Sequence, residues 1–207
     1  MLMEKDSLIR KPTSYQIGIM FCLWRYSKKS NKIIFTSDNI YFLEQIKNLF
    51  VSNIETYISL HKRTRFKIST YPNKELLKIF NIDINNIPSR LNNLPENIDL
   101  REFFRAYLEI NSKFQMYENK TDNKRIRRRL RITGREVCLN TLNSYAEDQG
   151  LASKKSITNV SSQKINCHSL SYTIKEELIN LYNFFHVEPY CEEYWKSLKE
   201  NIETYHK

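Results

Sequence analysis

Apolar residues recur at helical spacing along some stretches of the chain and alternate with polar residues along others. Helical spacing predicts helices over 14–26, 39–50, 73–80, 100–110, 135–150, 175–185 and 192–206. Alternation predicts strands over 33–37, 55–62, 64–70, 112–118, 125–133, 155–162 and 165–173. Capping residues support three of these helices, because Ser14, Ser37 or Asp38, and Asp99 stand where an N-terminal cap is needed. Gly150 stands where a helix would end.

The order of these elements repeats along the chain. Both halves are interpreted as the order helix, strand, strand, helix, strand, strand, helix, with about ninety residues per copy, although in the first half alternation marks only one strand, 33–37, before the second helix. Between the halves, a stretch with little periodicity is interrupted by Pro88 and Pro95. The sequence therefore predicts an α+β fold of two pseudo-symmetric αββαββα repeats. Their predicted bounds are 1–80 for the first repeat, 81–98 for a linker, 99–188 for the second repeat and 189–207 for a C-terminal helix.

Two of the predicted strands place basic residues on one face. In one of them Arg65 and Lys67 alternate with Phe66 and Ile68, and the strand over 125–133 carries arginine at every second position. Such a strand is either a solvated, charge-protected face or a surface for a polyanion, and the mutual repulsion of the arginines favours the polyanion. With the basic turns nearby, the candidate nucleic-acid-binding residues are Lys28, Lys29, Lys32, Lys62, Arg63, Arg65, Lys67, Lys124, Arg125, Arg127, Arg129 and Arg131.

The charge balance points to the same kind of partner. The chain has 33 Lys and Arg against 23 Asp and Glu, a formal net charge of +10. Lysine and arginine displace counterions from phosphates, so this excess suggests a nucleic acid. We expect no membrane partner, because no apolar run approaches the ~18–20 residues that span a bilayer. The N-terminus lacks the apolar core of a secretory signal, and the four cysteines form no C-x-x-C pair, so we expect reduced thiols in the cytoplasm or an organelle matrix and no metal site.

The repeated order, with a small residue inside the first helix of each half, resembles the LAGLIDADG homing endonuclease family. The segment FFRAYLEINSKF (103–114) is similar to the motif helix of that family. Ala106 falls on its close-packing glycine, Glu109 on its first acidic residue and Asn111 on its second, metal-binding acidic residue.

The first half carries a more degenerate copy of the motif, YQIGIMFCLWRY (15–26), which aligns through Gly18. That alignment puts Leu23 at the metal-binding position. The resemblance implies that Gly18 and Ala106 lie at the interface between the two motif helices.

The departures from the motif bear on catalysis. The resemblance implies that Mg²⁺ ions lie between the two helix ends, where they need anionic oxygen ligands from both copies. Leu23 has no ligand atom, and the neutral amide of Asn111 is a weaker ligand than a carboxylate. Glu109 lies two positions earlier on the helix, about 200° around its axis, and points elsewhere. We therefore expect no catalytic residue, no bound cofactor, and nuclease activity that is absent or severely reduced.

The sequence leads to one main hypothesis and two alternatives. The main one is a LAGLIDADG-type protein, either a monomer or a subunit of a larger complex, that binds DNA or RNA. Its binding surface would be a saddle formed by the basic faces of its two sheets. The first alternative is an active site-specific endonuclease that cleaves double-stranded DNA with Mg²⁺. The second is a protein-interaction subunit of a ribonucleoprotein, in which Tyr190, Tyr194 and Trp195 dock on a partner rather than pack on the second half.

Overall fold

The chain divides into two compact units, Met1–Phe103 and Phe104–Lys207. The computed structural model describes residues 8, 10–50, 53–59, 63–118, 126–160, 167–188 and 191–204. The first unit contains α1 (Ser14–Leu23), β1 (Trp24–Ser27), β2 (Lys32–Ser37), α2 (Ile40–Lys47), β3 (Glu55–Ile58), β4 (Thr64–Thr70) and α3 (Lys74–Ile79). The second contains most of α4 (Leu100–Asn111), then β5 (Ser112–Glu118), β6 (Ile126–Gly134), α5 (Glu136–Asp148), β7 (Thr158–Asn159), β8 (His168–Tyr172), α6 (Lys175–Phe185) and α7 (Glu192–Glu203).

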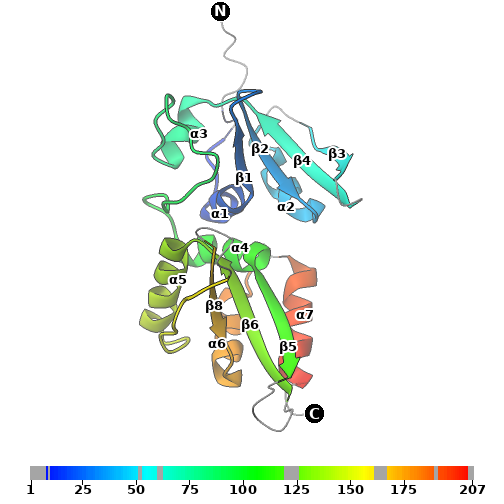
Figure 1. Ribbon diagram of the computed structural model, residues 1–207, viewed down its shortest axis with the longest axis vertical. Helices are drawn as coiled ribbons and strands as arrows, with labels where there is room; N and C mark the ends of the chain where they lie inside the picture. Colours follow the sequence, from blue (N-terminus) through cyan, green and yellow to red (C-terminus); the bar gives the residue numbers. More distant parts are fainter. Residues whose placement is uncertain are drawn as a thin grey trace, which may run out of the picture. The chain divides into compact units, whose positions relative to one another are not determined.

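The two units share one topology (Figure 1). Each holds a four-stranded antiparallel sheet, with strand order β1-β2-β4-β3 in the first and β5-β6-β8-β7 in the second. If the strands of each sheet are counted from one in chain order, both sheets have the same spatial order, 1-2-4-3. The predicted α+β class and the internal duplication are therefore confirmed.

Helices cover one face of each sheet. In the first unit α1 and α2 pack on β2, and α2 also contacts β4. In the second unit α5 packs on β6 and β8, and α7 packs on α6. Alternate strand residues supply the buried layers; they are Trp24, Ile33, Phe35 and Ile68 in the first unit and Leu130, Ile132, Leu170 and Tyr172 in the second. The residues between them form the outer face of each sheet. No helix in the described part of the chain is long and apolar enough to cross a membrane.

Two of the predicted helix starts are wrong by a residue or two, and one is right. Thr13, not Ser14, caps α1, because its side chain and that of Gln16 form a capping box. Asn39 caps α2 by accepting a hydrogen bond from the Tyr41 amide at 2.9 Å. Asp99 caps α4 as predicted, since its carboxylate accepts from the Arg101 amide at 2.9 Å.

The first helix is shorter than the sequence predicts. It ends at Leu23, and Trp24 begins β1 instead of continuing the helix. The indole of Trp24 is fully buried, packs edge-on against Phe35 and Phe80, and donates to the Pro88 carbonyl at 3.1 Å. Helical propensity gives way here to tertiary contacts that only the strand conformation provides.

The segment 81–98 contains no helix or strand and belongs to the first unit. The Tyr26 amide in the edge strand β1 donates to the Ser89 carbonyl at 3.2 Å, and the Arg90 guanidinium donates to the Trp24 carbonyl at 2.8 Å. Ile87 and Leu91 are buried. The segment thus satisfies part of an otherwise open sheet edge.

The last helix packs into its own unit, so of the two interpretations of its aromatic residues, packing on the second half is the one that holds for Trp195. That indole is 1% exposed and lies 5.9 Å from the Tyr182 ring, centre to centre. The Tyr194 hydroxyl is hydrogen-bonded to Ser112 at 2.5 Å, and burial raises the pKa of this phenol. Tyr190 lies outside the described residues.

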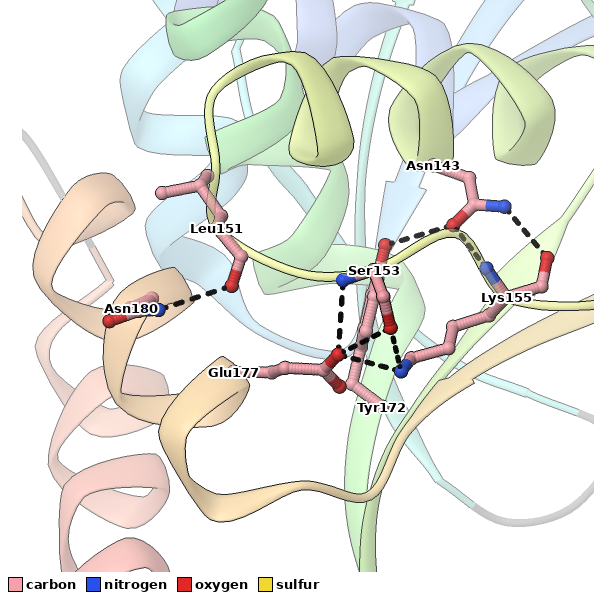
Figure 2. Close-up of polar contacts among 7 residues, drawn as sticks. All are labelled: Asn143, Leu151, Ser153, Lys155, Tyr172, Glu177 and Asn180. Carbon is pink, nitrogen blue, oxygen red and sulfur yellow. Dashed lines mark hydrogen bonds and ion pairs between the residues drawn. The ribbon is translucent and has the colours of Figure 1, made fainter.

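A polar network fixes the connection from α5 to β7 (Figure 2). The buried Glu177 carboxylate accepts from the Ser153 amide at 3.0 Å and pairs with the Lys155 ammonium at 2.6 Å. Asn143 exchanges two hydrogen bonds with the backbone of Lys155, at 2.8 and 3.1 Å. These bonds hold a segment without regular structure against α5 and α6, and so place the short strand β7 at the sheet edge.

Gly134, at the end of β6, has no room for a side chain. A Cβ at this position would lie 1.7 Å from the hydroxyl oxygen of Tyr107, whose ring is 2% exposed. We expect Gly134→Ala to lower the free energy of unfolding by roughly 1–3 kcal/mol through overpacking. In chemical denaturation, adding Tyr107→Phe should restore part of this loss, since it removes the clashing oxygen. Equal losses in the single and double variants would show that the Tyr107 hydroxyl is not the obstacle.

Candidate nucleic-acid interface

The outer face of the first sheet carries several of the predicted basic residues. Strand pairing aligns Thr36, Lys67 and Glu55 across β2, β4 and β3, and sets Arg65 opposite Tyr57. Lys28, Lys29 and Arg63 are exposed in the adjoining turns. The ammonium of Lys32 lies 5.2 Å from the centre of the Tyr71 ring.

Two of these cations already have acidic partners. Lys67 pairs with Glu55 at 2.9 Å, and its ammonium also lies 5.8 Å from the Tyr57 ring centre. Arg65 pairs with Asp38. Partly exposed pairs of this kind are worth about 0–1 kcal/mol, so a phosphate could displace them. They nevertheless lower the positive field of the first sheet.

The outer face of the second sheet is more uniformly basic. The register aligns Lys113, Arg131 and Ser171 across β5, β6 and β8, and sets Gln115 opposite Arg129 and Thr133 opposite Ser169. None of these residues is acidic. The Arg129 guanidinium donates to the Gln115 side-chain oxygen at 3.0 Å.

Some predicted residues cannot be placed on these faces. Lys62, Lys124 and Arg125 lie outside the described residues, and only the backbone of Arg127, opposite Tyr117 in the β6–β5 pairing, is described. Gly18 and Ala106 are both buried. Their role between the motif helices stays a prediction.

A pocket of about 290 Å³ opens at the C-terminal end of α4. Residues from the end of the helix, from β5 and β6, and from the position after β7 line it; they are Ile110, Asn111, Ser112, Lys113, Gln115, Arg131, Thr133 and Val160. The Thr133 hydroxyl donates to the Asn111 carbonyl at 3.2 Å, which ties β6 to the helix end. The lining contains two cations and no carboxylate.

Glu109, the acidic residue nearest this helix end, is directed into the core of the second unit. Its side chain is 6% exposed. One carboxylate oxygen accepts from the Trp195 indole at 2.5 Å and from the Cys191 amide at 3.2 Å. Glu109 therefore fastens α7 to α4 instead of facing the pocket.

The residues at the two helix ends do not fit Mg²⁺, which requires oxygen ligands and prefers carboxylates. Leu23, at the end of α1, is buried and has no ligand atom. Asn111, at the end of α4, offers an amide beside Lys113 and Arg131. The described residues hold no group of three or more His, Cys, Asp and Glu side chains that could bind a metal.

Burial raises the pKa of the Cys138 thiol to about 12, so this cysteine is protonated at neutral pH.

Sequence reasoning missed Lys113 and Gln115 as members of the basic face. Both stand at alternate positions of the predicted strand 112–118, which offered a signal. Their placement opposite Arg131 and Arg129, however, depends on the β5–β6 register. A shift of one residue would turn both side chains to the covered face.

Comparison with known proteins finds similarity in structure only. No protein-family model matches the sequence, and no curated protein matches it. Among solved structures, the I-SmaMI LAGLIDADG homing endonuclease bound to cleaved DNA is similar with a TM-score of 0.60 and 9% identity, over 96% of this chain and 90% of that one. I-LtrWI bound to target DNA gives 0.57 and 12%, over 92% and 89% of the two chains. I-GzeII in complex with its DNA target gives 0.54 and 13%, over 93% and 90%.

These similarities span almost the whole of each chain and match the repeated topology described above. The protein has the LAGLIDADG homing endonuclease fold.

The buried bonds of Glu109 predict a structural role for this residue. We expect Glu109→Ala to lower the free energy of unfolding by roughly 1–3 kcal/mol, because it leaves the Trp195 indole N–H buried without its acceptor. Glu200→Ala, at an exposed position of α7, serves as the control and should change stability by a few tenths of a kcal/mol. Thermal and urea unfolding would measure both. Equal stabilities of the two variants would contradict the role of Glu109.

Proposed function

We propose that this protein binds double-stranded DNA through the outer faces of its two sheets and does not cleave it. The observation that carries the proposal is the second sheet, whose outer face presents Lys113, Arg129 and Arg131, with Arg131 between Lys113 and Ser171 and with Arg129 opposite Gln115. Phosphate contacts from such a face supply affinity that does not depend on sequence. Solved structures with the same fold hold DNA, which supports duplex DNA over RNA as the partner.

The helix ends support the absence of cleavage. Metal-assisted phosphodiester hydrolysis needs a cation that stabilises the attacking and leaving oxygens, and that cation needs anionic ligands. Leu23 and Asn111 supply none, and the carboxylate of Glu109 is engaged by Trp195 and Cys191. The protein then acts by occupying DNA, alone or as part of a larger complex.

A binding and cleavage assay tests this proposal. Purified protein is titrated into labelled random duplex DNA and structured RNA, with Mg²⁺, Mn²⁺ or EDTA. We expect duplex binding whose affinity falls on the order of a thousand-fold or more between 50 and 200 mM salt, if six or more phosphates are contacted. The strands should remain intact under all conditions.

Other results would contradict the proposal in distinct ways. Metal-dependent strand breaks would establish the active endonuclease. A preference for structured RNA would move the function to RNA binding. Affinity that does not change with salt would exclude the basic faces as the binding surface.

The ion pairs of the first sheet predict an unequal contribution from the two faces. We expect Arg131→Gln to weaken DNA binding more than Arg65→Gln, because Arg65 already pairs with Asp38 while Arg131 lines a pocket that contains no carboxylate. Titrations of both variants at one salt concentration would measure this difference. The opposite order would show that the first sheet dominates binding.

A further inference from the structure

The pocket at the C-terminal end of α4 is lined by positively charged side chains, whereas a metal site is lined by negatively charged ones. Lys113 and Arg131 occupy directly paired positions of β5 and β6, and both line the pocket. Like charges at directly paired positions of a sheet destabilise it. The partial negative charge at the end of α4, about half an elementary charge, offsets only a fraction of these two positive charges. The pocket therefore favours an anion.

Arg131 also retains an unused donor. Its Nε–H is buried and has no hydrogen-bond partner among the described residues. A buried donor without an acceptor costs free energy, and a ligand oxygen in the pocket would remove this cost. The planar fork of a guanidinium matches the paired oxygens of a phosphate.

The remaining polar groups of the pocket suit the same ligand. The side-chain oxygen of Gln115 is engaged by Arg129, so its other terminal group is an NH₂ donor. Thr133 ties the rim of the pocket to the carbonyl of Asn111. The volume of about 290 Å³ is at the lower limit of ligand pockets, which fits a phosphate group better than a whole nucleotide.

We propose that this pocket holds one backbone phosphate of the bound nucleic acid between Lys113 and Arg131, so that these two cations neutralise the phosphate without a metal ion. This inference rests on the proposed function and adds a specific contact to it. It makes DNA binding independent of divalent metal and concentrates affinity at the end of α4.

The test compares charge-removing variants of the full-length protein on labelled random duplex DNA in EDTA. Lys113→Gln and Arg131→Gln should each weaken binding roughly tenfold and lower the slope of log affinity against log salt by about 1. Arg131→Lys should keep the slope and lose affinity, because it retains the charge but not the fork. Lys196→Gln removes an equal charge from an exposed position of α7 and should change neither quantity.

The outcomes separate this inference from the proposed function. Salt-dependent binding that Lys113→Gln and Arg131→Gln leave equal to that of Lys196→Gln would overturn the phosphate site alone. Binding that requires Mg²⁺ would also overturn it. Absence of binding by the unaltered protein would overturn both proposals. Thermal unfolding checks each variant, and because Lys113 is exposed, Lys113→Gln tests the site even if Arg131→Gln does not fold.

Discussion

The buried carboxylate of Glu109 organises the second unit. It accepts hydrogen bonds from the indole of Trp195 and the amide of Cys191, and so joins the end of α4 to the start of α7. A buried carboxylate is stable only when hydrogen bonds replace its hydration, and these two donors do so. The same bonds turn the acid away from the outer face of the sheet. One interaction thus completes the core and leaves the pocket at the end of α4 without a carboxylate.

What the sequence predicts well in this chain depends on local patterns. Alternation in β4 and β6 identifies both strands and the face that carries their charges, because strand side chains alternate whatever the strand pairs with. Asp99 and Gly150 mark helix ends through local backbone chemistry, and Gly150 adopts a φ of +67°. The repeated order of elements predicts the duplicated topology, although most of β1 is predicted as the end of the first helix.

What the sequence does not predict depends on contacts between distant residues. Trp24 follows an apolar helix without a breaker, and only its contacts with Phe35, Phe80 and Pro88 favour the strand. The sequence leaves open whether the aromatic residues of α7 pack on the second unit or dock on a partner, and only their hydrogen bonds to Glu109 and Ser112 decide for packing. The pocket likewise requires the β5–β6 register, which sets Lys113 beside Arg131.

Electrostatics decide whether the end of α4 favours a divalent cation or a phosphate. A divalent cation about 6 Å from one positive charge is repelled by roughly 1–6 kcal/mol, depending on whether the effective dielectric resembles water or a protein surface. Lys113 and Arg131 both line the pocket at the end of α4 and both repel a divalent cation there, and the amide of Asn111 offers little to offset this repulsion. The same two charges attract a phosphate. Under the proposed function, the absence of an acidic ligand and the presence of these two cations both favour binding of the DNA backbone over metal-dependent hydrolysis.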